Sequence, residues 1–142
     1  MSSMDQKRQE LADQLSFIED PYERFAYIID IGKQHPSVDG EFKQPMFEVE
    51  GCSSQLFLVP EFKEGQCIYH CDADAQIVKG IAAVLCQFYS HEAPRDVIEV
   101  EPDFMADLGI TQHLSPSRRN GLGLIREKIK NFAEACLEEQ AS

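Results

Sequence analysis

The sequence has no long hydrophobic run and is poor in positive charge. No apolar run approaches the roughly 18–20 residues that a membrane-spanning helix needs, and the polar residues 1–10 have neither the basic nor the apolar region of a signal peptide. Lys and Arg number 13 against 25 Asp and Glu, for a formal net charge of −12. Because this charge repels phosphate backbones and anionic lipids, we expect a cytoplasmic protein that binds neither nucleic acid nor membranes.

Familiar catalytic and ligand-binding motifs are missing as well. The chain contains no Gly-rich phosphate loop, no nucleophile elbow and no zinc-binding helix motif, which removes the main support for nucleotide binding and ordinary hydrolysis. Its five cysteines, at positions 52, 67, 71, 86 and 136, are an odd number, which favours reduced thiols over a disulfide framework. Each cysteine therefore has to be judged by its neighbours.

The length and patterning predict one α+β domain, 1–142, with its core at about 8–138. Two helices come first, the second beginning at Asp20-Pro21 and ending near Gly32. Short apolar runs at 46–50, 55–60 and 67–71 then predict a small three-stranded antiparallel sheet. Several helices follow and pack against it; Asp72 or Asp74 can cap the first of them, and Ser115-Pro116 begins the last.

Gly51-Cys52-Ser53-Ser54 is the most informative short motif, because it falls at an expected loop tip between two strands. A projected cysteine could act as a nucleophile if neighbouring N–H groups and hydroxyls stabilise its thiolate. Glu48 and Glu50 oppose this by raising a nearby thiol pKa, so activation requires a cation from elsewhere. An incidental or buried loop cysteine is the alternative that the tetrapeptide leaves open.

The remaining candidate residues carry weaker signals. Cys67 and Cys71 lie about 13 Å apart in an extended strand, too far to share one zinc ion, and His70 points to the other face. We expect no metal site, and we interpret Cys86 and Cys136 as structural residues of helices. Arg118 opposes the dipole of the last helix, which indicates another use or a solvated position; His113 alone predicts no catalysis.

Three ordered motifs resemble the SufE family of sulfur acceptors: GCSSQLF at 51–57, DADAQIVKG at 72–80 and HLSPSRRNGL at 113–122. The resemblance extends from Leu11 to Ala135 and includes YIIDIG at 27–32. It implies a fold similar to iron–sulfur scaffold proteins. It also places the family cysteine at Cys52, with family positions near the cysteine loop or the partner surface at Gly51, Ser53, Asp72, Asp74, His113 and Arg118.

The resemblance implies a sulfur carrier with no cofactor of its own. Such a protein accepts sulfane sulfur as a persulfide on Cys52 from a pyridoxal-phosphate cysteine desulfurase, which it also stimulates, and passes the sulfur to an iron–sulfur cluster assembly scaffold. It acts as a partner of the desulfurase rather than as a stand-alone enzyme. A homodimer stays open. Arg118 is the cation that the resemblance favours.

The chain departs from the family pattern at two aromatic positions. Phe57 stands where the family usually has Trp, and Phe47 where many members have Asn. We expect the loop to shelter Cys52 against apolar side chains, namely Met46, Phe47, Phe57 and Leu58. The alternatives are a desulfurase-activating adaptor of a paralogous branch that serves another sulfur acceptor, a metal-binding scaffold, and a cysteine hydrolase that would need His113 near Cys52.

Overall fold

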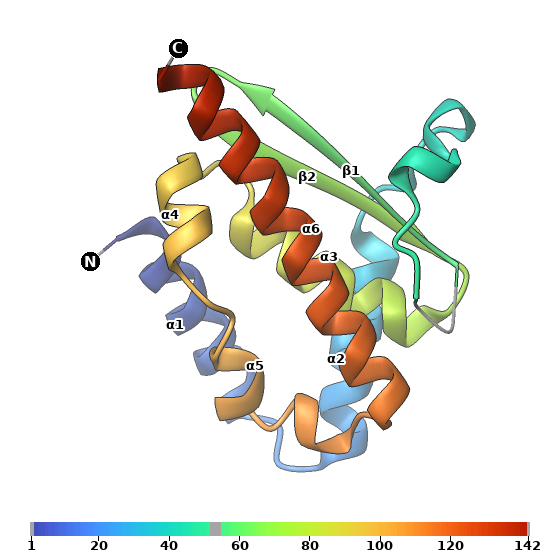
Figure 1. Cartoon of the computed structure of the whole chain (residues 1–142). Helices are drawn as coiled ribbons and strands as arrows, with labels where there is room; N and C mark the ends of the chain where they lie inside the picture. Colours follow the sequence, from blue (N-terminus) through green and yellow to red (C-terminus); the bar gives the residue numbers. More distant parts are fainter. Residues whose placement is uncertain (1, 52–54, 142) are drawn as a thin grey trace.

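The computed structural model describes residues 2–51 and 55–141. Helices pack against one face of an antiparallel hairpin, and the long helix α6 runs past both the hairpin and α3 (Figure 1). The elements in chain order are α1 (Ser3–Ser16), α2 (Pro21–Gln34), η1 (Gly40–Phe42), η2 (Pro45–Phe47), β1 (Leu56–Lys63), β2 (Gln66–Ala73), α3 (Gln76–Tyr89), α4 (Pro94–Glu99), α5 (Phe104–Asp107), η3 (Thr111–His113) and α6 (Pro116–Ala141). The α+β class is confirmed, and no helix in the described ranges is both long and apolar enough to cross a bilayer.

The expected third strand is wrong: within the described residues the sheet has two strands, β1 and β2. The 3₁₀ turn η2 begins at Pro45 and takes up Met46 and Phe47 of the expected strand 46–50, and Glu48 then forms an isolated bridge with Phe57. Proline has no N–H for a ladder, and the chain turns again at Gly51, which has a φ of +90°. Too few residues remain between these two turns for a strand.

The register of the hairpin assigns its two faces. Leu58 lies opposite Cys71, and both side chains belong to the core, whereas Val59 lies opposite His70 on the outer face. Phe57 and Val59 are nevertheless only 6% and 8% exposed. Val59 lines a groove together with residues of the segment 36–42, so this segment, which ends in the 3₁₀ helix η1, borders the outer face.

Helices α2 and α3 cross closely at two glycines. A Cβ on Gly32 would lie 2.7 Å from the backbone nitrogen of Gly80, and a Cβ on Gly80 would lie 2.4 Å from the carbonyl oxygen of Ile28. Neither position has room for a side chain. The prediction that α2 ends near Gly32 is therefore wrong. The helix continues to Gln34, and Gly32 permits its close contact with α3.

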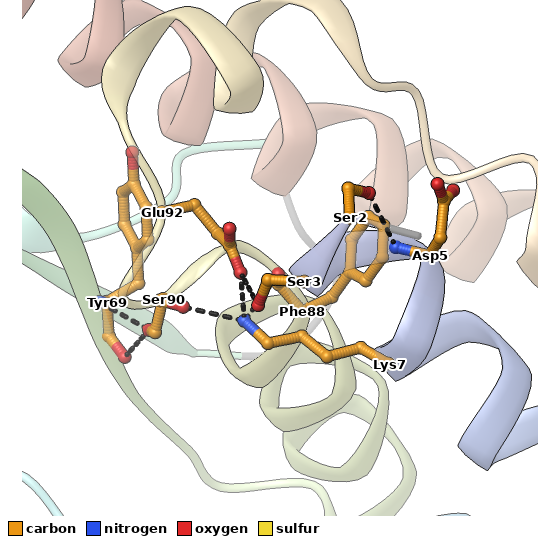
Figure 2. A network of polar contacts seen from close by, with 8 residues as sticks. All are labelled: Ser2, Ser3, Asp5, Lys7, Tyr69, Phe88, Ser90 and Glu92. Carbon is orange, nitrogen blue, oxygen red and sulfur yellow. Dashed lines mark hydrogen bonds and ion pairs between the residues drawn. The ribbon is translucent and has the colours of Figure 1, made fainter.

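A polar network joins α1 to the end of α3 (Figure 2). The Nζ of Lys7 donates hydrogen bonds to the carbonyl oxygens of Phe88 and Ser90, at 3.2 and 2.7 Å, and pairs with the buried carboxylate of Glu92 at 2.6 Å. A cation at a helix C-terminus satisfies carbonyls that have no partner within the helix. The network fixes the position of α1 against the core without using any predicted site residue.

Helix α6 presents the predicted apolar stripe to the core. Ile125, Ile129 and Cys136 are buried, and Leu122 and Phe132 pack partly against the core. Ser115 accepts a hydrogen bond from the backbone N–H of Arg118, at 3.3 Å, which confirms the cap that the sequence predicts. Leu124 and Lys128, beside this stripe, are α6 residues that contact the segment 48–51.

Candidate functional site

The loop that contains Cys52 is held at its first end by the hairpin and α6. The buried residue Val49 donates its backbone N–H to the carbonyl oxygen of Leu56, at 2.9 Å. Gly51 then turns with φ +90°, and a Cβ there would lie 3.0 Å from Cδ1 of Leu124 on α6. Both the backbone angle and the contact with Leu124 favour glycine at this position.

Asp74 holds the other end of the same loop. Its carboxylate oxygen Oδ1 accepts the backbone N–H of Gln55 at 3.1 Å, and its own N–H donates to the carbonyl of Gln55 at 3.2 Å. The predicted helix-capping role of Asp74 is therefore wrong, since α3 begins after Ala75, which makes no side-chain capping bond. Asp74 instead closes the loop across a separation of 19 residues.

A cation that the sequence analysis missed also reaches this loop. The Nζ of Lys128 donates a hydrogen bond to the carbonyl oxygen of Glu48, at 2.7 Å. Lys128 follows Leu124 by four residues and so lies on the same side of α6. The four-residue spacing from Leu124 is visible in the sequence. It indicates a contact with the loop only once α6 is known to pack against that loop.

Arg118, the cation favoured from the sequence, has an N–H group that lacks a partner. Its Nη1 is buried and makes no hydrogen bond within the described part of the chain. Arg118 lies six residues before Leu124, about 9 Å along the helix axis and about 120° around it, so the two side chains leave α6 on different sides. Since buried guanidinium nitrogens are normally paired, this N–H is available to an acceptor that the described residues do not supply.

Asp72 is buried and fixes the segment that precedes the loop. Its carboxylate accepts the backbone N–H of Val38 at 3.2 Å and lies 3.4 Å from Lys43 and 3.6 Å from Lys79. Burial opposes ionisation, but the Val38 N–H and the two lysines outweigh it and lower the pKa of Asp72. Like Asp74, it does not cap α3; its side chain is a structural clamp for residues 38–43.

Three predicted site residues cannot be placed fully. Cys52 and Ser53 lie outside the described residues. His113 ends η3, but the structure describes only its backbone. The cysteine hydrolase alternative, which depends on His113 meeting Cys52, therefore stays a prediction. What the structure brings together is Gly51, Asp74, Lys128 and the backbone that flanks Cys52.

The other four cysteines are all buried. Burial raises the pKa of Cys67 and Cys136. The thiol of Cys86 lowers the pKa of Cys71 by hydrogen bonding, with a smaller effect of His35, while burial raises the pKa of Cys86 itself. All four thiols are buried, which agrees with the structural role predicted for Cys86 and Cys136. No cluster of three or more His, Cys, Asp or Glu in the described ranges could hold a metal ion.

The expected apolar shelter of Cys52 stays a prediction, because Cys52 lies outside the described residues. Phe57 and Leu58 are buried and Phe47 is half-buried, but Met46 is 72% exposed. Met46 lies on η2, with most of its surface in solvent. Exposure of a long apolar side chain beside the loop bears on partner binding.

These features define a class: a small α+β protein that holds a cysteine-containing loop between a β-hairpin and a long helix. A family model of SufE, described as an Fe-S metabolism associated domain, matches residues 9–133. Because it spans most of the sequence, the chain belongs to the SufE family.

Relatives agree with this assignment. The chain is 35% identical over 116 residues to an uncharacterized SufE-like protein of Synechocystis, a match that covers 82% of this chain and 73% of the relative. It is 34% identical over 117 residues to SufE-like protein 1, chloroplastic/mitochondrial, of Arabidopsis thaliana. That match covers 82% of this chain but only 32% of the longer relative. A solution structure of a hypothetical protein from Thermus thermophilus shares the fold, with a TM-score of 0.75, 18% identity, and coverage of 93% and 96% of the two chains.

Proposed function

We propose that this protein is a sulfur carrier in iron–sulfur metabolism, with Cys52 as the residue that holds the sulfur. The anchoring of the loop at both ends carries the proposal: Val49 and Gly51 fix one end and Asp74 fixes the other. A short loop fixed in this way limits the positions available to a thiol between its ends. Family membership supplies the kind of chemistry, because the matching domain is associated with iron–sulfur metabolism.

The transfer step is a thiol exchange on a persulfide. The Cys52 thiolate attacks the terminal sulfur of a cysteine persulfide on a desulfurase, forming one S–S bond while the original S–S bond breaks. The desulfurase cysteine leaves as a thiolate, and Cys52 becomes the persulfide, so the step involves no net oxidation. A second exchange passes the sulfur to the thiol of an iron–sulfur assembly scaffold. The partner supplies the pyridoxal phosphate.

Two cations on α6 support thiolate formation in this proposal. Lys128 binds the backbone at Glu48, and Arg118 has a buried N–H with no described partner. Positive charge near a thiol lowers its pKa and raises the thiolate fraction. Lys128→Met should therefore move the pH profile of Cys52 alkylation upward, whereas Lys128→Arg should retain most of the effect. Equal profiles for both variants and the parent would assign Lys128 a purely structural role.

Intact mass spectrometry tests the carrier function directly. After incubation with a cysteine desulfurase and cysteine, without reductant, the protein should gain about 32 Da per sulfur, mapped to Cys52. Cys52→Ser should gain nothing, and the matched control Cys136→Ser, which removes a thiol of the core, should gain as much as the parent. Desulfurase stimulation that survives unchanged in Cys52→Ser, with no mass gain in the parent, would favour the adaptor function instead.

A further inference from the structure

A groove of about 470 Å³ lies on the outer face of the hairpin, away from the buried thiols. It runs between the segment 36–42 and the strands. Its lining includes Val38, Asp39, Phe42, Val59, Pro60 and Glu61. Its volume falls within the range of about 300–1,000 Å³ that is typical of ligand-binding pockets. None of the residues proposed for sulfur transfer lines it.

The walls of the groove are fixed by interactions already described. The sheet register places Val59, Glu61 and His70 on the outer face. The carboxylate of Asp72 binds the backbone N–H of Val38 and pairs with Lys43, which holds the opposite wall over that face. The groove is therefore a built feature of the fold, and its shape depends on the clamp at Asp72.

The chemistry of the groove combines apolar contact with negative charge. Val38, Phe42 and Val59 supply apolar surface, while Asp39 and Glu61 supply carboxylates. His70 lies 3.2 Å from Glu61, with both side chains about half exposed, and neither Lys nor Arg is among the described lining residues. Together with the net charge of −12, this favours a ligand that carries a cation on an apolar stem.

The apolar surface continues beyond the groove, further than a small molecule would reach. Phe42 at its rim is 37% exposed and touches Phe47, with ring centroids 5.9 Å apart. Met46, which precedes Phe47 on η2, is 72% exposed. Exposed apolar side chains around a pocket, with charges at its edge, are typical of protein contact sites. A second acidic copy of this chain would bring like charges together.

We propose that this groove binds an extended segment of a partner protein that has Lys or Arg next to an apolar residue. The cation contacts the carboxylates of Asp39 and Glu61, and the apolar neighbour packs on Val38 and Val59. Residues outside the groove then contact Phe42 and Met46. η2 ends at Phe47, five residues before Cys52 in the sequence, and the binding itself needs no sulfur chemistry.

Peptide titration monitored by NMR tests the proposal. The probes are a basic peptide, acetyl-Val-Arg-Leu-Lys-Val-amide, and its acidic counterpart with Glu at both charged positions. Saturable shifts confined to residues 36–42, 59–61 and 70 are expected for the basic peptide and none for the acidic one. Added salt should weaken the binding. Shifts centred elsewhere, or no saturable shift at about millimolar peptide, would refute the proposal.

Matched variants separate location from total charge. Glu61→Gln with Asp39→Asn should weaken peptide binding by roughly threefold or more, whereas Glu99→Gln with Glu134→Gln, which removes two exposed acids on α4 and α6, should leave it unchanged. Cys52→Ser should bind the peptide as the parent does, which keeps this result independent of the proposed sulfur transfer. Equal binding by free arginine amide, or dilution-dependent shifts at the groove without peptide, would identify a small cation or a second copy as the occupant and overturn the proposal.

Discussion

Asp72→Asn should destabilise the protein by removing a buried charge while keeping the shape of the side chain. The carboxylate lies 3.4 Å from Lys43 and 3.6 Å from Lys79, and it accepts the backbone N–H of Val38. Asparagine can still accept one N–H, but it leaves Lys79, whose side chain is only 16% exposed, without its anion. Loss of a charge-assisted contact of this kind costs about 1–3 kcal/mol.

The pH dependence of this loss is part of the prediction. The neighbours of Asp72 lower its pKa in the folded protein, so the stabilisation is complete above the usual range of an Asp carboxyl, near 3.9 in model peptides. It is lost as the pH falls through the lowered folded value, because the protonated side chain then resembles asparagine. The difference between parent and Asp72→Asn should be full at neutral pH and shrink toward zero in acid.

Urea unfolding at a series of pH values measures both quantities. Glu134→Gln, which changes an exposed acid on α6, is the control for the altered net charge and should shift stability by less than about 0.5 kcal/mol. A difference for Asp72→Asn that is the same at neutral and acid pH would refute the charge argument. A difference no larger than that of the control would refute the clamp itself.

Three further outcomes follow from named contacts. Gly80→Ala should destabilise the protein by about 1–3 kcal/mol despite the better helix propensity of alanine, since the new Cβ meets the backbone of Ile28; thermal unfolding that is unchanged or improved would contradict this. Asp74→Ala should cost about 0.5–1 kcal/mol and slow sulfur acceptance by Cys52, whereas Asp74→Asn, which retains an acceptor for the Gln55 N–H, should behave almost like the parent in the mass assay. In native Cys52→Ser, the remaining thiols should react with maleimide at least about 100-fold more slowly than after unfolding, and rapid native labelling would contradict their burial.

Much of the local structure was predictable because it depends on neighbouring residues. Asp20 accepts the N–H of Tyr22 and caps α2 with Pro21 behind it, and Ser115 caps α6 in the same manner. These caps need only the residues within one turn, which the sequence displays directly. The exposed position of His70 and the buried one of Cys71 likewise follow from the alternation of a strand.

For the candidate site, the sequence predicted the position of the loop but not the residues that contact it. The motif at Gly51 located the loop from a local signal, and the positive φ there agrees with it. The partners of the loop were not predictable, because Lys128 and Glu48 are 80 residues apart and meet only after α6 packs on the hairpin. No local pattern marks a lysine on a helix as the one that will reach a distant carbonyl.

The sequence by itself determined the caps of α2 and α6, the alternation of the strands, the burial of Cys86 and Cys136 and the family to which the chain belongs. The tertiary structure decided that Asp72 and Asp74 hold loops instead of capping α3, that Gly32 permits a helix crossing, and that 46–50 forms no strand. The physical reason is the separation in sequence between the residues that make each contact. Caps and strand periodicity are set by contacts within a few residues, whereas each of these outcomes depends on backbone groups that only the completed packing brings within hydrogen-bond or van der Waals distance.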